Sequence, residues 1–351
     1  MPAPCHPRAA LAAILLSLAG GAAAVDVTLT PLQPSVARGE DVVVRVLLSN
    51  TSGKVEHLLR WRTPLDSIDG PLFEVLRDGQ PVRYLGRSVK RPPPGPGDYL
   101  RLAPGATLSR TVELSALYDM NVTGSYTIRY RAAALPAPAT TGIVALPASA
   151  AMQSGAVSIW IEGRLPRGSK TAPPVTTLVA GAGLTYDHCS NAQQEQLVTA
   201  LDAGRAMAAD SHAYLTAKQD LGTRYTTWFG APDTARAAKV AGNVTAVKDA
   251  FENKPVKINC DCNEPYFAYV YPARPYTVWV CKAFWAAAVT GTDSRGGTLL
   301  HELSHFDVVA GTDDHVYGQT GAADLARTAP ERAINNADSY EYFGENSPPQ
   351  Q

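Results

Sequence analysis

The hydrophobic pattern changes character once along the chain, and this change constrains the fold more than any other feature. Up to about residue 163, apolar and polar residues alternate in short runs, such as VVVRVLLSN at 42–50 and YTIRYRA at 126–132. Half-buried antiparallel strands require this alternation. After residue 184 the chain is alanine-rich, and apolar residues such as Leu197 and Leu201 recur at helical spacing. The pattern therefore predicts a multidomain protein with two domains of different class.

The segment between the two patterns, residues 164–184, has the Pro, Gly, Ser and Thr content of a linker. Before it, short strands separated by turn signals predict an all-β immunoglobulin-like sandwich over residues 25–163, although the Cys, Trp, Cys hallmark of true immunoglobulin domains is missing. Asp78-Gly79 predicts a tight hairpin within it. The second domain, residues 185–351, is predicted to be mainly α with a small β element (α+β). We expect helices over 190–215, 232–253 and 298–310, and a hairpin over 267–281.

The N-terminus, residues 1–24, has the composition of a secretory signal peptide. Arg8 precedes an apolar run over residues 9–19, and three alanines at 22–24 provide a small-residue cleavage site. The run is shorter than the roughly 18 residues that a membrane span requires. We therefore expect a secreted protein without a membrane span, whose mature chain begins near Val25.

Four cysteines remain after Cys5 is removed with the signal peptide, and all lie in the second half. An even number in an exported chain favours disulfides. A four-cysteine zinc site is the alternative, but its ligands normally stand further apart than Cys260 and Cys262 do. Spacing alone leaves three pairings open. The four residues are Cys189, Cys260, Cys262 and Cys281.

Charge is distributed unevenly between the two halves. The first 184 residues have a net charge of +6 and the remainder −7. Opposite fields of this kind favour association of the halves at low salt. Neither half has the strong basic excess of a nucleic-acid-binding protein, so no nucleic-acid partner is expected.

The stretch HELSH at 301–305 indicates a metal site. His301 and His305 are four residues apart, so on a helix they share one face with Cβ atoms about 6 Å apart, within reach of one ion. Glu302 stands where the zinc-protease motif has its general base. The alternative is a solvated helix face carrying two ordinary histidines.

A catalytic zinc ion requires three protein ligands and a water molecule, so a third ligand must follow. The metzincin pattern fails, because Val308 and Gly311 stand where it requires glycine and histidine. A glycine at 311 can turn the chain back under the helix. The residues downstream that can complete the site are Asp313, Asp314, His315 and Glu331.

The residues after the motif resemble the aspzincin family of zinc metalloendopeptidases. The family pattern G-T-x-D-x-x-Y-G is matched by Gly311, Thr312, Asp314, Tyr317 and Gly318. The resemblance implies a zincin-type fold and one Zn²⁺ ion with Asp314 as third ligand. It also implies that Tyr317 steadies the oxyanion and that neither Asp313 nor His315 is a ligand.

Within that family, residues 185–351 are most similar to peptidyl-Lys metalloendopeptidases, through stretches such as TYDHCS at 185–190 and NADSYEYFGENSP at 336–348. The resemblance implies that Cys189 pairs with Cys260 and Cys262 with Cys281. It also implies that Asp338 and Glu341 select lysine on the C-terminal side of the cleaved bond. Three-residue spacing on a helix would place both carboxylates on one side, where they can pair with an ammonium group.

Together these features predict a secreted zinc metalloendopeptidase that cleaves protein and peptide substrates before lysine, with Glu302 as general base. A broad-specificity, deuterolysin-like neutral protease is one alternative, and a secreted non-catalytic binding or adhesion protein is another. We expect the N-terminal domain to act as a propeptide that contacts the catalytic domain in cis. Lys170 in the linker offers a self-cleavage site. The alternative for this domain is a retained binding module.

Overall fold

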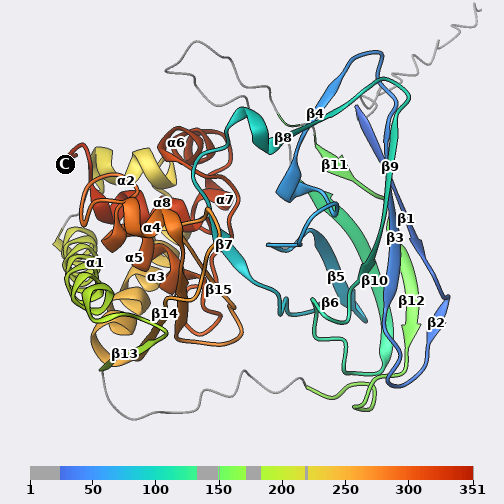
Figure 1. Ribbon diagram of the computed structural model, residues 1–351, viewed down its shortest axis with the longest axis horizontal. Coiled ribbons are helices and arrows are strands. Elements are labelled where there is room, and N and C mark those ends of the chain that lie inside the picture. Colours follow the sequence, from blue (N-terminus) through green and yellow to red (C-terminus); the bar gives the residue numbers. More distant parts are fainter. Residues whose placement is uncertain (1–23, 133–148, 150, 171–182, 218–219, 351) are drawn as a thin grey trace, which may run out of the picture.

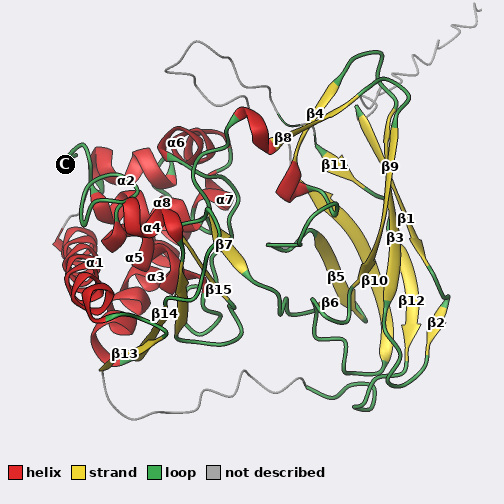
Figure 2. Cartoon of the chain, viewed as in Figure 1, coloured by secondary structure: helices red, strands yellow, loops and turns green. Residues whose placement is uncertain are grey.

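The computed structural model describes residues 24–132, 149, 151–170, 183–217 and 220–350. Strands dominate the first part of the chain and helices the second (Figures 1 and 2). Residues 1–23 of the predicted signal segment and residues 171–182 of the predicted linker lie outside the described residues. None of the described helices has both the length and the apolar character of a membrane span.

The first part is β-rich, and two of its sheets share one core. One sheet has the order β1-β3-β9 and the other β2-β12-β10-β5-β6, with β11 beside β10 and a separate β4-β8 ladder. The strands are β1 (Val25–Pro31), β2 (Ser35–Val36), β3 (Val43–Asn50), β4 (Glu56–Leu59), β5 (Phe73–Arg77), β6 (Gln80–Pro81), β8 (Tyr99–Leu102), β9 (Thr107–Glu113), β10 (Gly124–Ala132), β11 (Met152–Gln153) and β12 (Val157–Ile161).

Alternation in the sequence produces this core directly. Along β10 the buried residues alternate with less buried ones, so Tyr126 and Ile128 face Val44 and Val46 of the other sheet within one apolar cluster. Asp78 and Gly79 both have positive φ between β5 and β6, which confirms the predicted hairpin. The β-rich class is thus confirmed, while the immunoglobulin-like topology stays a prediction.

The second part combines helices with a small sheet, as predicted. Its strands are β13 (Gly183–Asp187), β14 (Pro255–Asn259), β15 (Ala268–Val270) and β16 (Thr277–Val280). Its helices are α1 (Asn191–Ala217), α2 (Gly222–Phe229), α3 (Thr234–Asn253), α4 (Lys282–Ala286), α5 (Arg295–His305), α6 (Gln319–Thr328), α7 (Pro330–Ala333) and α8 (Ala337–Glu345). β15 and β16 form the expected hairpin.

The helix boundaries follow from capping. The Asp233 side chain accepts from two amides at the start of α3, and Ser294 Oγ accepts from the amide of Gly297 at the start of α5. The predicted helix 298–310 was therefore misplaced at both ends. It begins earlier because of the Ser294 cap, and it ends at His305 because Phe306 leaves helical geometry with ψ 131°.

Two disulfides fasten the second part. Cys189 pairs with Cys260 and Cys262 with Cys281, the pairing that the family resemblance implied. The first ties the start of α1 to the end of β14, and the second ties the following loop to the end of β16. Both lie in the part that carries the metal-site motif.

One strand of the second part's sheet comes from the first part. β7 (Ser88–Lys90) leaves the β-rich region and pairs antiparallel with β15, giving the sheet order β13-β14-β16-β15-β7. Figure 1 shows β7 crossing to the helical part beside β15. The sequence pattern predicted no strand here. This pairing brings residues from both parts to one site.

Candidate active site

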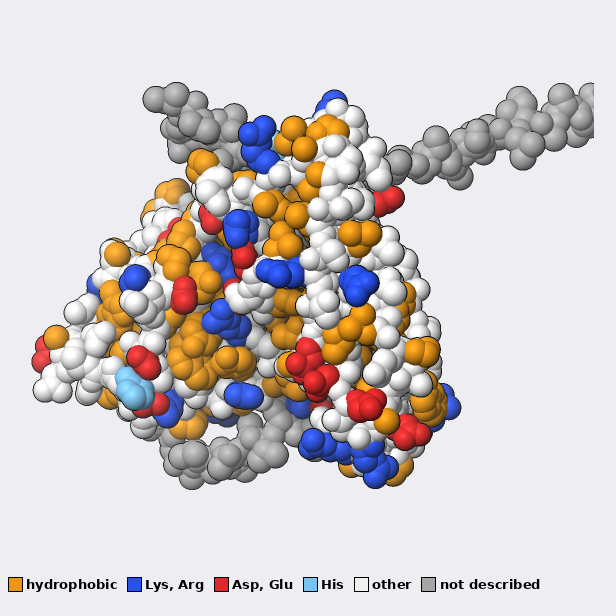
Figure 3. Space-filling view, turned by 45° about the vertical axis from the view of Figure 1, so that its right-hand side comes forward, with side chains coloured by type: hydrophobic (Ala, Val, Ile, Leu, Met, Phe, Trp, Pro, Cys, Tyr) orange, Lys and Arg blue, Asp and Glu red, His pale blue; other side chains and the backbone are white. Residues whose placement is uncertain are grey.

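Helix α5 carries the motif residues in the interior of the second part. His301, Glu302 and His305 have no exposed surface. The Nε2 atoms of the two histidines lie 3.1 Å apart. On the face drawn in Figure 3, side chains of the two parts of the chain lie against each other.

The loop after α5 returns Asp314 to the two histidines. Gly311 has a φ of +57°, a conformation that glycine adopts without strain and that lets the chain reverse. Asp314 Oδ1 then lies 3.1 Å from His301 Nε2 and 3.4 Å from His305 Nε2. On its other side, the His305 ring faces the Thr312 carbonyl, with Nδ1 2.7 Å from the oxygen. That contact favours a proton on Nδ1 and leaves Nε2 free to bind a cation.

The other acids and the histidine that the sequence left open make contacts outside this cluster. Asp313 Oδ2 accepts a hydrogen bond from Asn335 Nδ2 at 3.0 Å, and Glu331 pairs with Arg236 at 2.7 Å near the surface. The backbone carbonyl of His315 accepts a hydrogen bond from the guanidinium of Arg62. Of the four candidates, only Asp314 joins His301 and His305 in a cluster whose ligand atoms all lie within 4.8 Å of one another.

The donor set of this cluster fits a zinc ion. Two imidazole nitrogens and one carboxylate oxygen are ligands typical of catalytic zinc. Both carboxylate oxygens of Asp314 and of Glu302 are buried without a hydrogen-bond partner in the described structure. Burying a carboxylate without compensation costs several kcal/mol or more, so a cation at this point would stabilise the arrangement.

Asp314 and Glu302 differ in the pKa of their carboxyl groups. Burial opposes ionisation of Asp314, but His305 and His301 beside it hold its pKa well below the usual range. Burial raises the pKa of the Glu302 carboxyl to about 7. A carboxyl group with a pKa near neutrality is suited to take a proton and to give it back.

Tyr317 and Gly318 lie on the loop that leads into α6. The Tyr317 hydroxyl donates a hydrogen bond of 2.7 Å to the backbone carbonyl of Val89 in β7. Gly318, at φ +83°, donates its amide to Asp338 Oδ2 at 2.7 Å, which fastens the loop to α8. Tyr317 and Gly318, the last two residues of the family pattern, thus connect the metal-site loop to β7 and to α8.

Asp338 and Glu341 form a buried acidic pocket on one side of α8. The ammonium of Lys90 occupies this pocket, 2.6 Å from Glu341 Oε2 and 3.5 Å from Asp338 Oδ1. Lys90 itself has no exposed surface. Burial opposes its charge, but the surrounding carboxylates hold the pKa of Lys90 well above its ordinary value. A fully desolvated lysine is tolerated because it is paired on more than one side.

The pocket has a third acid that the sequence analysis missed. Asp293 Oδ1 lies 3.3 Å from Lys90 Nζ and accepts a hydrogen bond of 2.7 Å from the Tyr342 hydroxyl. The rings of Phe267 and Tyr342 also lie within 6 Å of the ammonium, at 5.1 and 5.8 Å. Asp293 stands in a loop before α5, with no periodicity that relates it to α8, so the sequence pattern contained no signal for it.

The acidic pocket and the metal cluster share a boundary. His301 Nδ1 lies 2.9 Å from Asp338 Oδ1 and 3.2 Å from Glu341 Oε2. A carboxylate behind a ligand histidine fixes the ring and increases its basicity. The three residues also form a second group with metal-binding geometry, but the Lys90 ammonium already supplies the cation there.

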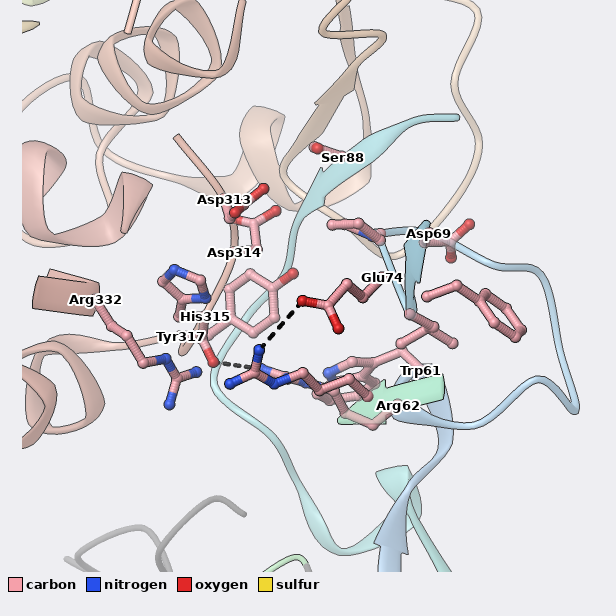
Figure 4. Close-up of a pocket in the computed structure, with 15 residues that line it drawn as sticks. Trp61, Arg62, Asp69, Glu74, Ser88, Asp313, Asp314, His315, Tyr317 and Arg332 are labelled. Carbon is pink, nitrogen blue, oxygen red and sulfur yellow. Dashed lines mark hydrogen bonds and ion pairs between the residues drawn. The ribbon is translucent and has the colours of Figure 1, made fainter. Parts of the chain in front are cut away.

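Beside the metal cluster, the two parts of the chain line a partly open cavity of about 450 Å³. Figure 4 shows Asp314 and Tyr317 on one wall, and Arg62 and Glu74 of the β-rich part on the opposite wall. Ser88 lines the cavity as well. The cavity therefore lies next to the N-terminal end of β7, at the residue before Val89, whereas Lys90 follows Val89 and occupies the acidic pocket.

A family model and several known proteins match this chain. The aspzincin model, described as lysine-specific metallo-endopeptidase, matches residues 214–345. The chain is 45% identical over 349 residues to an extracellular protease of Aeromonas hydrophila, covering 97% of this chain and 98% of that protein. It is 31% identical over 345 residues to a peptidyl-Lys metalloendopeptidase of Armillaria mellea, covering 95% and 92%. A solved structure of a zinc peptidase from Grifola frondosa shares 43% identity and covers 46% of this chain and 100% of that one, with a TM-score of 0.45.

Proposed function

Because the chain belongs to the aspzincin family and is a zinc metalloendopeptidase, we propose that it hydrolyses peptide bonds on the N-terminal side of lysine. The observation that supports this most is the buried ammonium of Lys90 between Asp338, Glu341 and Asp293. The pocket accepts a lysine side chain in full. The name of the Armillaria mellea relative points to the same specificity.

The position of the cleaved bond follows from Tyr317. Its hydroxyl binds the carbonyl of the residue that precedes the lysine in the pocket. A donor at this carbonyl would stabilise the negative charge that develops on the oxygen during attack by water, a contribution typically of about 3 kcal/mol. The bond between that carbonyl and the lysine nitrogen is therefore the one that would break, leaving lysine at the start of the second product.

His301, His305 and Asp314 would hold the zinc ion. When bound, zinc acidifies a water molecule and polarises the substrate carbonyl. Glu302, which is buried beside the histidines and has a pKa near 7, would take a proton from the attacking water and pass it to the leaving amine. Asp338 and Glu341 would fix the substrate lysine by charge-assisted contacts.

For the remainder of the chain we retain the predictions made from the sequence. Residues 1–24 act as a signal peptide, residues 25–163 fold as an immunoglobulin-like sandwich that serves as propeptide, and residues 164–184 link it to the protease. The name of the Aeromonas hydrophila relative and the two disulfides support export. N-terminal sequencing of secreted protein tests this. A start near Thr185 supports a propeptide, and a start at Val25 would instead indicate a retained module.

The activity is tested by digesting a denatured lysine-containing protein and mapping the cut sites by mass, with and without a chelator. We expect cuts before lysine that the chelator abolishes. Cuts at many residue types would indicate a broad-specificity protease, and no cuts at all would indicate a binding protein. Glu302→Gln should retain zinc but lose turnover by at least about 100-fold. Asp314→Ala should lose zinc, and full zinc content in that variant would refute the ligand assignment.

A further inference from the structure

Residues 88–90 lie in the site as an extended peptide. Their register places Lys90 opposite Ala268, Val89 opposite Tyr269 and Ser88 opposite Val270. The amide of Phe267 also donates to the Lys90 carbonyl at 3.1 Å. Adding a strand to an exposed sheet edge is a recurrent mode of peptide recognition, in which the backbone gives affinity and alternate side chains give specificity. The β-rich part therefore presents a segment to the protease in the manner of a peptide ligand.

Both sides of one peptide bond in this segment contact the residues to which the proposed function assigns substrate recognition. On the N-terminal side, the Val89 carbonyl accepts the hydrogen bond from Tyr317. On the C-terminal side, the Lys90 ammonium is held by Glu341 at 2.6 Å. Together these two contacts match the arrangement that the proposed function gives to the bond of a lysine substrate.

From this geometry we propose that Val89–Lys90 is the first bond that the enzyme hydrolyses in its own chain, and that Lys90 excludes other lysine substrates until then. The inference rests on the proposed function. The reaction consumes one water molecule. Its oxygen and one hydrogen go to the Val89 carbonyl carbon, the carbon–nitrogen bond breaks, and the other hydrogen goes to the nitrogen of Lys90.

The first 184 residues contain few lysines, so few other bonds before a lysine compete with Val89–Lys90. Only Lys54, Lys90 and Lys170 occur there, and arginine supplies the other basic residues. Lys54 and Lys170 are exposed in the structure. Of the three, only Lys90 has an ion pair to Asp338 or Glu341 among the described residues. Lys170, which the sequence suggested as a self-cleavage site, thus serves as a matched control.

The first experiment follows self-cleavage by mass and N-terminal sequencing under denaturing conditions. After zinc is added to the full chain, we expect a fragment that begins at Lys90. This fragment should also form in Lys54→Ala and Lys170→Ala but not in Glu302→Gln or Lys90→Met. Lys90→Met retains most of the aliphatic stem, and its thermal unfolding is compared with wild type to establish that it folds. An intact Val89–Lys90 bond in wild-type protein that cuts added lysine peptides would overturn the inference.

The second experiment measures binding without turnover. In the Glu302→Gln chain, a fluorescent lysine peptide should bind at least tenfold more tightly once Lys90 is replaced by Met or Gln, and equally weakly after Lys170→Ala. Equal affinity with and without Lys90 would overturn the exclusion. If no variant, including Lys90→Met with Glu302 intact, cuts added lysine peptides, the proposed function fails and this inference fails with it. If wild type cuts these peptides but forms no fragment that begins at Lys90, and if replacing Lys90 leaves the peptide affinity unchanged, this inference alone fails.

Discussion

Asp338 contacts two different functional groups. One oxygen lies 2.9 Å from the Nδ1 atom of His301, and the other accepts the amide of Gly318. The lysine ammonium is 3.5 Å away, whereas Glu341 lies only 2.6 Å from it. The two acids that family resemblance groups together therefore divide their work. Because Glu341 Oε2 also lies 3.2 Å from His301 Nδ1, both acids contact both groups, but we expect Asp338 to act more on the histidine and Glu341 more on the lysine.

This division predicts different consequences for two neutral substitutions. Asp338→Asn should weaken zinc binding by about 10–100-fold, because it removes the carboxylate behind a ligand histidine. Glu341→Gln should raise KM for lysine peptides and affect zinc binding less. Competition with a metallochromic chelator measures the first effect, and steady-state kinetics on the active enzyme measure the second. Equal loss of zinc in both variants would contradict the division.

Asp293 provides a second prediction for a single residue. It contacts the lysine ammonium at 3.3 Å but none of the metal-site histidines among the described ion pairs. Since a hydrogen bond to a charged group contributes about 1.5–3 kcal/mol, Asp293→Asn should raise KM for lysine peptides by about 10-fold or more and leave zinc content unchanged. Asp324→Asn, which removes an acid from the exposed surface of α6, is the control. An unchanged KM in Asp293→Asn would exclude this acid from recognition.

At the scale of elements, α5 holds its position through an unusually close crossing with α1. A Cβ atom added to Gly204 of α1 would lie 2.9 Å from the Gly296 carbonyl oxygen of α5 and 2.7 Å from the Phe251 ring. A Cβ atom on Gly296 would lie 2.9 Å from Ala203. Glycines at this crossing therefore set the depth of the helix that carries the metal-site histidines.

The crossing predicts opposite effects for two glycine-to-alanine changes. Gly204→Ala should destabilise the protein by about 1–3 kcal/mol, because the added methyl group overpacks a backbone contact. Gly242→Ala, on an exposed position of α3 with open space around its Cβ, should stabilise by up to about 1 kcal/mol through helix propensity. Chemical denaturation of both variants measures the difference. If the two variants had similar free energies of unfolding, α1 and α5 would be able to move apart and admit the methyl group at no cost in stability.

The elements also show which features a sequence can predict. Helices α1 and α3 have long periodic patterns and side-chain caps, so local spacing was enough to predict them. Asp338 and Glu341, three residues apart on one short helix, were identified by the family resemblance, because their spacing alone equally fits a solvated acidic face. β7 is three residues long, and its partner β15 lies nearly 180 residues further along the chain. No local pattern encodes such a pairing. Lys90 and Asp293 could therefore be placed only by the tertiary structure, even though the pocket they complete was expected.

At the scale of the whole molecule, the position of Val89–Lys90 determines what a cut there would achieve. The strands before this bond pair with strands after it, since β3 pairs with β9, β4 with β8 and β5 with β10. The apolar core of the β-rich part also includes residues from both sides, such as Val46 and Tyr126. A cut would therefore open the backbone without separating the β-rich part.

Consequently, we predict that the self-cleaved chain stays together under native conditions. Size-exclusion chromatography should show one species of unchanged size, while denaturing electrophoresis of the same sample shows two fragments. Urea at a concentration that unfolds the β-rich part should separate them in solution. Two species in native buffer would contradict the prediction. Because the pairing persists after the first cut, releasing the whole β-rich part requires a second cut between the end of β12 at Ile161 and the start of β13 at Gly183.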